Sequence, residues 1–166
     1  MSTPFQGRIH RFGDEVNTDV ILPGRYLSLR RPEELGRHCM EGLDPDFVNR
    51  VRPGDILAVG RNFGCGSSRE HAVIALKAAG ITAIVAVSAA RIFFRNAVNL
   101  GLPVITCPDA AAALREGEEA RIDLDTNSVA QGGRTWEGAA LGDEVRAILA
   151  AGGLVQRVRQ ALANAA

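Results

Sequence analysis

The sequence predicts an α/β domain in which parallel strand–helix units are joined to antiparallel strands. In the middle of the chain, apolar runs typical of strands buried on both faces alternate with helical patterns. These segments are 56–59, 69–79, 81–87, 89–100 and 102–106. In the last third, polar and apolar residues alternate over 120–124 and 127–136 around Asp125-Thr126 or Gly132-Gly133, as in antiparallel pairing. We therefore expect a single α/β domain over residues 1–166 with some antiparallel sheet.

The remaining elements have local signals of their own. Gly7 to Phe12 is predicted to form a short strand. Pro32 to Met40 is predicted to form a helix, because proline stands in its first turn and Glu33 and Glu34 favour the positive end of the helix dipole. Glycines end the two middle helices, and two amphipathic helical segments follow near the end of the chain. These are Gly80, Gly101, 142–150 and 154–163.

The charge balance argues against two classes of partner. The chain has 19 basic and 19 acidic residues and a formal net charge of +0, with 46% hydrophobic residues. We therefore expect neither nucleic acid nor an anionic membrane as the main partner. Of the 19 basic residues, 18 are arginine and only Lys77 is lysine. Arginine is the side chain best suited to fork onto carboxylates.

The cysteines argue against a metal centre within this chain. Cys39, Cys65 and Cys107 lie far apart without CxxC spacing, so neither a self-contained zinc site nor an iron–sulfur site is expected. An odd cysteine count without a secretory signal is typical of reduced thiols. Residues 1–10 lack the apolar stretch of a signal peptide, and no window approaches the roughly 18 apolar residues that span a bilayer. The expectation is a cytoplasmic protein.

The most informative stretch is the glycine-rich segment 60–72, which reads GRNFGCGSSREHA. It follows a predicted strand and opens a predicted helix, which is where open α/β sheets bind ligands. Glycines let the backbone approach a ligand, and a helix N-terminus favours an anion. The spacing matches neither a P-loop nor a GxGxxG fingerprint, so nucleotide binding loses most of its support.

Two interpretations compete for the polar residues of this segment. Ser67 and Glu70 have the spacing of a capping box, which would make them structural. A capping box, however, does not require Ser68, Arg69 and His71 in the same turn. A polar cluster at the mouth of a glycine-rich loop indicates carboxylate recognition beside a positioned hydroxyl.

Other candidates also have ordinary structural explanations. Cys65 and His71 are a candidate nucleophile–base pair of a hydrolase, because a nearby helix N-terminus would lower the pKa of the thiol. The alternative is that Cys65 is a small residue in a tight turn. Asn17-Thr18-Asp19 is expected to form an Asx turn. The three arginines within 25–31 are expected either to be solvated or to close over an anionic substrate.

Three segments resemble the small subunits of 3-isopropylmalate dehydratase, a family of the aconitase superfamily. The first is the motif at 62–72, which reads NFGCGSSREHA. The second is the loop 14–22 with its Asn-Thr-Asp element, and the third is 90–103, which reads ARIFFRNAVNLGLP. The resemblance covers most of residues 7–165, in order, at the length of a free-standing small subunit.

The resemblance implies a fold and an activity. The fold is the aconitase-type swivelling domain, a three-layer β/β/α arrangement with a mixed sheet. The implied enzyme is a hydro-lyase of leucine biosynthesis that isomerises 2-isopropylmalate to 3-isopropylmalate by dehydration and rehydration. In this family the domain covers a large subunit that carries a [4Fe–4S] cluster, one iron of which acts as a Lewis acid. The implied partners are this large subunit, without which the small one is inactive, and a small hydroxy-dicarboxylate substrate.

The resemblance also implies roles for individual residues. Ser67 matches the serine that, as an alkoxide, removes a proton from the substrate carbon, and Asp19 matches the aspartate that supports the active-site network. Arg69 matches the arginine that binds a substrate carboxylate, and Ser68 its neighbouring hydrogen-bond partner. A serine alkoxide needs amide donors, a helix N-terminus and arginines to stabilise it. The glycine-rich loop and Arg69 are expected to supply them.

The loop 26–31, which contains Ser28 and Arg30, corresponds to the loop that helps choose the substrate's variable side chain. Relatives acting on isopropylmalate tend to carry apolar residues there, and homoaconitases tend to carry an arginine. Ser28-Leu29 followed by Arg30-Arg31 matches neither pattern, so homoaconitate, methylmalate and dimethylmalate are alternatives to isopropylmalate. From a different class, the chain would be a carboxylate-binding module whose Ser-Ser-Arg-Glu turn only caps a helix.

Overall fold

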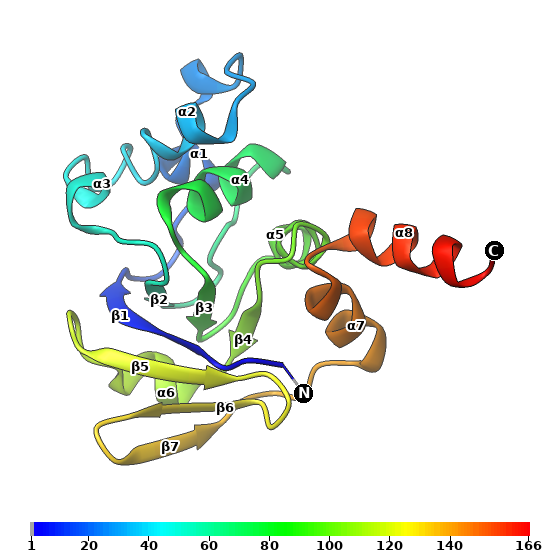
Figure 1. Cartoon of the computed structure of the whole chain (residues 1–166). Helices are drawn as coiled ribbons and strands as arrows, with labels where there is room; N and C mark the ends of the chain where they lie inside the picture. The colour runs from blue at the N-terminus through cyan, green and yellow to red at the C-terminus, as the bar shows by residue number, and fades with distance from the viewer. Residues whose placement is uncertain (1) are drawn as a thin grey trace.

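A computed structural model describes residues 2–166 of the chain. Within this range the strands form one seven-stranded sheet in the order β4-β3-β2-β1-β5-β6-β7 (Figure 1). The strands are β1 (Phe5–Arg11), β2 (Ile56–Val59), β3 (Ala83–Ala86), β4 (Val104–Thr106), β5 (Glu119–Asp123), β6 (Ser128–Gln131) and β7 (Arg134–Glu137).

The sheet is mixed, and its parallel and antiparallel halves join at β1. On one side β1 pairs in parallel with β2, with Ile9 opposite Ile56, and the parallel pairing continues through β3 to β4. On the other side β1 pairs antiparallel with β5, with Gly7 opposite Ala120, and β6 and β7 extend this half. A single strand therefore ties both halves together.

The helices form mainly on the connections of the parallel half. They are α1 (Thr18–Ile21), the 3₁₀ helix η1 (Gly24–Tyr26), α2 (Pro32–Gly36), α3 (Phe47–Arg50), α4 (Glu70–Ala79), α5 (Arg91–Asn99), α6 (Pro108–Ala113), α7 (Asp143–Ala151) and α8 (Leu154–Asn164). Helices α4 and α5 are the crossovers that return the chain from β2 to β3 and from β3 to β4.

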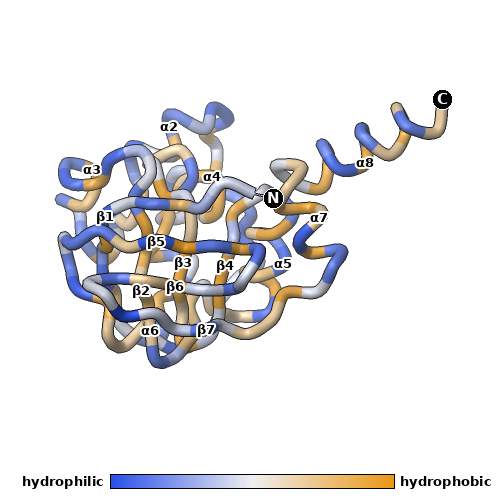
Figure 2. Tube along the Cα trace, turned by 60° about the horizontal axis from the view of Figure 1, so that its bottom comes forward, coloured by the Kyte–Doolittle hydropathy of each residue, from blue (hydrophilic) through white to orange (hydrophobic). Residues whose placement is uncertain are grey.

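Side chains of the parallel strands alternate between two hydrophobic clusters, and this alternation creates three layers. Leu57 and Ile84 belong to the cluster that includes Leu76 of α4. Ile56, the neighbour of Leu57, belongs instead to the cluster that includes Ile122 of β5. Helices, parallel strands and antiparallel strands are thus stacked in turn, with hydrophobic residues concentrated along the inner strands (Figure 2). This arrangement confirms the β/β/α fold.

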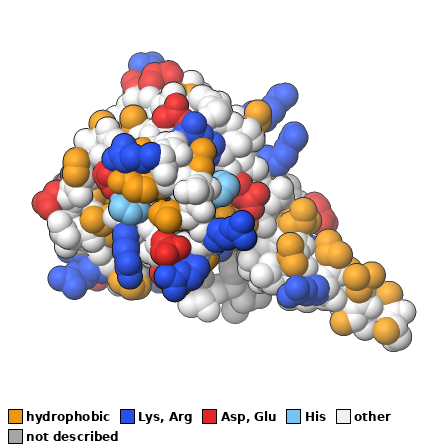
Figure 3. Space-filling view, turned by 90° about the horizontal axis from the view of Figure 1, so that it is seen from above, with side chains coloured by type: hydrophobic (Ala, Val, Ile, Leu, Met, Phe, Trp, Pro, Cys, Tyr) orange, Lys and Arg blue, Asp and Glu red, His pale blue; other side chains and the backbone are white. Residues whose placement is uncertain are grey.

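The last two helices lie beside the end of α5. A Cβ on Gly101 would come within 2.4 Å of the Gly152 carbonyl oxygen, so this junction requires a glycine. Helix α8 then projects from the body and buries none of its residues (Figure 1). Its hydrophobic side chains are visible on the projecting end in Figure 3. Those most exposed are Leu154, Val155, Val158 and Leu162. No helix within residues 2–166 is long and apolar enough to cross a membrane.

Most elements agree with the sequence predictions, and two differences are informative. The helix predicted over Pro32 to Met40 is wrong beyond Gly36, where residues 37–40 form turns. Met40 itself adopts a φ of +62°, which an α-helix cannot contain. The sequence also gives no prediction for the short helices α1, η1, α3 and α6. The antiparallel turns predicted at Asp125-Thr126 or at Gly132-Gly133 are both present, since β6 pairs with β5 and with β7.

Candidate active site

The ends of three neighbouring parallel strands meet at one edge of the sheet. The segment after β1 runs beside the segment after β2, where the Thr18 amide donates to the Cys65 carbonyl oxygen at 2.9 Å. The segment after β3 joins them, because the Ala90 amide donates to the Phe63 carbonyl oxygen at 2.9 Å. Carboxyl ends of parallel strands share an edge, so segments distant in the sequence become neighbours here.

Two glycines allow the loop after β2 to pack this closely. Gly64 has a φ of +78°, and a Cβ there would lie 2.1 Å from the Phe93 ring. Gly66 has a φ of +92°, and a Cβ there would lie 2.6 Å from Oδ1 of Asn17. Phe63 is fully buried and meets Phe93 edge to face, with ring centroids 5.2 Å apart. The loop is therefore held between the Asn17 turn and α5.

The Asx turn predicted at Asn17-Thr18-Asp19 is confirmed. Oδ1 of Asn17 accepts a hydrogen bond from the Asp19 amide at 2.8 Å and so caps the short helix α1. Thr18 is buried, and its hydroxyl donates to the Ser67 carbonyl oxygen at 2.9 Å. The turn thus orients Asp19 and fixes the backbone at Ser67 at the same time.

Asp19 lies between the Ser67 hydroxyl and the Arg69 guanidinium. Its Oδ1 atom is 2.6 Å from Nη1 of Arg69 and accepts a long hydrogen bond from Oγ of Ser67 at 3.5 Å. The Arg69 side chain is 22% exposed and that of Asp19 is 54% exposed. The structure therefore brings together three of the predicted site residues, a hydroxyl, a carboxylate and a guanidinium, where a ligand can reach them.

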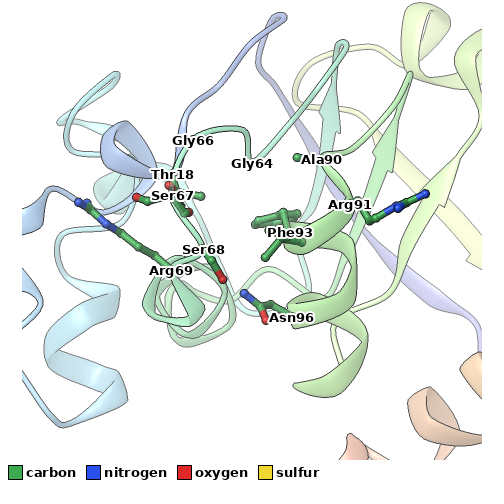
Figure 4. Close-up of a pocket in the computed structure, with 11 residues that line it drawn as sticks. Thr18, Gly64, Gly66, Ser67, Ser68, Arg69, Ala90, Arg91, Phe93 and Asn96 are labelled. Atoms are coloured by element: carbon green, nitrogen blue, oxygen red, sulfur yellow. Dashed lines mark hydrogen bonds between the residues drawn. The ribbon is translucent and has the colours of Figure 1, made fainter.

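A pocket of about 280 Å³ opens between this loop and the beginning of α5 (Figure 4). Its lining residues come from three segments: Thr18; Gly64, Gly66, Ser67, Ser68 and Arg69; and Ala90, Arg91, Ile92, Phe93 and Asn96. Figure 4 shows the side chains of Ser68 and Asn96 turned toward each other, whereas those of Arg69 and Arg91 extend away on opposite sides. The pocket therefore has a polar pair at its centre and cations at its margins.

The capping box considered for Ser67 and Glu70 is wrong. Helix α4 begins at Glu70, its N-cap residue is Arg69, and no side chain caps it. The expected stabilisation of Ser67 by this helix end is therefore not seen. The positive group near Ser67 is instead the Arg69 guanidinium, because Oδ1 of Asp19 contacts both Arg69 and the Ser67 hydroxyl.

The low-pKa thiol expected at Cys65 is also wrong. Burial, together with the charge of Glu15, raises the pKa of this thiol, opposite to the shift that activates a nucleophile. The helix expected to lower this pKa begins only at Glu70, and its N-cap residue is Arg69 rather than a residue next to Cys65. The structure thus favours the tight-turn interpretation of Cys65.

Ser28 and Arg30 lie outside the pocket. Both are exposed, on the segment between η1 and α2, and neither lines the pocket described above. The neighbouring Arg31 is engaged within the chain, with its Nη2 atom 2.9 Å from Oε1 of Glu34. A role for Ser28 and Arg30 in choosing the substrate stays a prediction.

A single carboxylate anchors this segment. Oε1 of Glu41 accepts hydrogen bonds from the Tyr26 hydroxyl and the Arg25 guanidinium, both at 2.6 Å. Nδ1 of His38 lies 2.6 Å from Oε2 of Glu41, and its ring stacks on Tyr26 at 3.6 Å. The hydrogen bond from Tyr26, with those from His38 and Arg25, holds the pKa of Glu41 below its usual value. No sequence pattern predicts a role for His38, and these contacts with Glu41 and Tyr26 show that it is structural.

The residues of this chain do not fit an iron–sulfur cluster. Cys39 and Cys107 are buried in different hydrophobic clusters, and Cys65 lies on the glycine-rich loop. Burial raises the pKa of Cys39, which opposes the thiolate that a cluster needs. Within residues 2–166, no group of three or more His, Cys, Asp or Glu side chains could hold a metal ion.

The pocket residues contributed by the segment after β3 are not predicted as site residues from the sequence: Ala90, Arg91, Ile92, Phe93 and Asn96. The resemblance includes the segment 90–103 as a whole but implies no role for a residue within it. The place of this segment in the fold could have indicated that it contributes to the site. It follows β3, whose carboxyl end lies next to that of β2 at the same edge of the sheet.

Comparisons with known proteins show the family to which the chain belongs. The family model for the aconitase C-terminal domain matches residues 36–110. The 3-isopropylmalate dehydratase small subunit of Heliobacterium modesticaldum is 48% identical over 162 residues, which are 96% of this chain and 98% of that relative. The 2,3-dimethylmalate dehydratase small subunit of Eubacterium barkeri is 46% identical over 155 residues, which are 92% of this chain and 95% of that relative.

A solved structure gives the same result. The structure of 3-isopropylmalate dehydratase from Methanocaldococcus jannaschii matches with a TM-score of 0.91 at 45% sequence identity, over 96% of this chain and 95% of that one. The match therefore covers almost the whole fold. The chain belongs to the 3-isopropylmalate dehydratase small-subunit family of the aconitase superfamily.

Proposed function

We propose that the chain is the small subunit of a hydro-lyase that converts 2-isopropylmalate into 3-isopropylmalate in leucine biosynthesis. The observation that carries this proposal is the group formed by Ser67, Asp19 and Arg69 at the edge of a pocket. The reaction class comes from relatives named for this activity, which match over nearly the whole chain.

Ser67 is proposed to carry a proton between two substrate carbons. As an alkoxide, it takes the proton from the carbon next to the one that bears the hydroxyl, while that hydroxyl departs as hydroxide and a double bond forms. Ser67 then returns the proton to the carbon that lost the hydroxyl, and hydroxide adds to the other. The proton and the hydroxide removed in the first half are both returned in the second, so substrate and product have the same composition, as an isomerisation requires.

Arg69 and Asp19 are proposed to prepare this serine and the substrate. The guanidinium offsets negative charge on Oγ of Ser67, and its remaining N–H groups are free to fork onto a substrate carboxylate. Asp19 fixes the guanidinium through the 2.6 Å ion pair and orients the serine hydroxyl. Ser68, whose hydroxyl is turned into the pocket, is a further donor to the substrate.

The partner is proposed to be a large subunit that carries a [4Fe–4S] cluster and covers the open side of the site. Two observations support this assignment: the cysteines here do not fit a cluster, and Asp19 is 54% exposed. One iron of the cluster carried by the partner would act as a Lewis acid toward the substrate hydroxyl. We further propose that the chain acts as one domain in the cytoplasm, where its three free cysteines would stay reduced.

A second candidate substrate is 2,3-dimethylmalate. The relative named for it is 46% identical to this chain, almost as similar as the 48% identical isopropylmalate relative. Both substrates are hydroxy-dicarboxylates that differ in their alkyl groups, so the same Ser67 chemistry serves either one.

The test uses the chain together with its large partner, in which the cluster is reconstituted anaerobically. Enoate absorbance is followed with 2-isopropylmalate, 2,3-dimethylmalate, methylmalate and homoaconitate in turn. We expect the highest kcat/KM with 2-isopropylmalate, no activity from the small subunit alone, and loss of turnover in Ser67→Ala. Full activity of the small chain alone, or of the Ser67→Ala complex, would contradict the proposal.

A further inference from the structure

The pocket contains one amide side chain, which has no part in the mechanism above. Asn96 lines the pocket from α5 and is partly buried. No hydrogen bond joins its amide to the other residues drawn in Figure 4. A partly buried amide loses hydrogen bonds to water when the chain folds. This loss is compensated only when another group forms hydrogen bonds with the amide. Asn96 therefore has capacity to bind a group that enters the pocket.

The amide of Asn96 faces the hydroxyl of Ser68 across the pocket (Figure 4). An amide has two N–H donors and a serine hydroxyl has one, so the two side chains together offer donors to an acceptor between them. Phe93 lies beside this pair in Figure 4 and is 2% exposed. Its ring makes one wall of the pocket apolar, which strengthens hydrogen bonds made next to it.

The Asn96 donor stands on a rigid support. Asn96 is within α5, whose next residue, Ala97, is fully buried, and α5 is fixed to the loop by the Phe63–Phe93 contact at 5.2 Å. Ser68 lies two residues after the closely packed Gly66 on that loop and is exposed. Little ordering of Asn96 is needed when a ligand binds, because the helix that carries it is already packed in position.

The Arg69 side chain leaves the pocket on the side away from Asn96 and ends beside Asp19. A substrate with two carboxylates therefore meets the Arg69 guanidinium on one side and the neutral pair of Ser68 and Asn96 between the two arginines, while Arg91 extends away on the opposite side. We propose that Asn96 is a substrate-binding residue that, together with Ser68, donates hydrogen bonds to the second carboxylate of the hydroxy-dicarboxylate. This inference rests on the function proposed above, because it takes its ligand from that reaction.

The kinetic test compares Asn96→Ala with Asn96→Asp in the reconstituted two-subunit complex. Removing the donors should raise KM for 2-isopropylmalate about tenfold in Asn96→Ala, with kcat changed much less. Asn96→Asp has nearly the same shape but places a negative charge against the carboxylate, so its KM should rise roughly a hundredfold. A purely structural amide predicts the reverse order, and KM in Asn96→Asp no higher than in Asn96→Ala would overturn the inference.

The control is Asn99→Asp on the same helix, outside the pocket lining. It adds the same charge to α5 and should leave KM within about twofold of the unchanged complex. A rise in Asn99→Asp equal to that in Asn96→Asp would mean that charge on α5, rather than contact with the substrate, is responsible, and the inference would fail.

A binding measurement separates this inference from the proposed function. Calorimetric titration of 2-isopropylmalate is compared for the complexes carrying Ser67→Ala and Ser67→Ala with Asn96→Asp. Weaker binding in the double variant, by tenfold or more, supports the carboxylate contact whether or not the complex turns over. Equal binding overturns it and leaves the hydro-lyase proposal standing. Absence of turnover with every malate tested in the unchanged complex instead overturns the proposed function.

Discussion

The carboxylate of Asp19 lies 2.6 Å from the guanidinium of Arg69 and accepts a hydrogen bond from Ser67 on the same oxygen. Asp19→Asn should therefore lower kcat/KM at least tenfold, because the amide loses the charge that holds Arg69 in place. Asp14→Asn is the matched control on the same segment, since Asp14 pairs with Arg61 at the surface, 3.2 Å away. Steady-state kinetics of the complex check this, and equal losses in both variants would argue against the role of Asp19.

Gly66→Ala should destabilise the chain by about 2–4 kcal/mol, because φ is +92° and the new Cβ would clash with the Asn17 side chain at 2.6 Å. Gly133→Ala separates the two causes. Its φ is +80° and nothing lies within 4 Å, so only the backbone cost of about 1–2 kcal/mol is expected. Urea unfolding of the isolated chain measures both, and similar losses would show that the contact with Asn17 is unimportant.

Cys65→Ala should keep kcat within a few-fold of the unchanged complex. The thiol has a raised pKa through burial and the Glu15 charge, so at neutral pH it is protonated and is a poor nucleophile. The readouts are the activity of the complex and the pH dependence of alkylation at Cys65, which should proceed fast only at alkaline pH. A loss as severe as that in Ser67→Ala would restore the cysteine-nucleophile hypothesis.

Asp55 should make the stability of the chain depend on acid pH. Burial acts to raise its pKa, but hydrogen bonds from His10 at 2.7 Å and from the Arg52 amide at 2.9 Å, with the charge of Arg8, lower it below 3.8. A lowered folded-state pKa means that the ionised carboxylate stabilises the fold above about pH 4. This contribution is lost as pH falls through the folded-state pKa.

Asp55→Asn should therefore unfold more easily than the unchanged chain at pH 7, by about 3 kcal/mol. The difference should shrink progressively below about pH 4, where the unchanged carboxyl becomes protonated. Urea unfolding between pH 3 and pH 7 measures it, with the exposed Asp109→Asn as the control that should show no such trend. A difference that stays constant with pH would indicate loss of packing rather than of charge.

Ser28→Arg should shift substrate preference toward an acidic side chain, if the segment between η1 and α2 meets the substrate in the complex. An added guanidinium would pair with the extra carboxylate of homoaconitate, so the ratio of kcat/KM for homoaconitate to that for 2-isopropylmalate should rise about tenfold. Competition assays with both substrates give this ratio. No shift would mean that selection is made elsewhere, since Ser28 does not line the pocket of this chain.

Local signals predicted what depends on near neighbours in the chain. The apolar run at 81–87 and the glycine that precedes it are correctly assigned, because burial pattern and αL caps act over a few residues. The capping box fails although Ser67 and Glu70 have the right spacing. The Ser67 carbonyl oxygen is bound by the Thr18 hydroxyl at 2.9 Å, and this tertiary contact competes with the helical start.

The sequence by itself determined the α/β class, the family resemblance and the identity of Ser67, Ser68 and Arg69 as residues with chemistry to offer. Only the tertiary structure decided which of them meet. It placed Asp19 against Arg69 and turned Asn96 toward Ser68, and it left Ser28 outside the pocket. The physical reason is that the site forms where β1, β2 and β3 end side by side, and strand pairing joins segments that no local pattern connects.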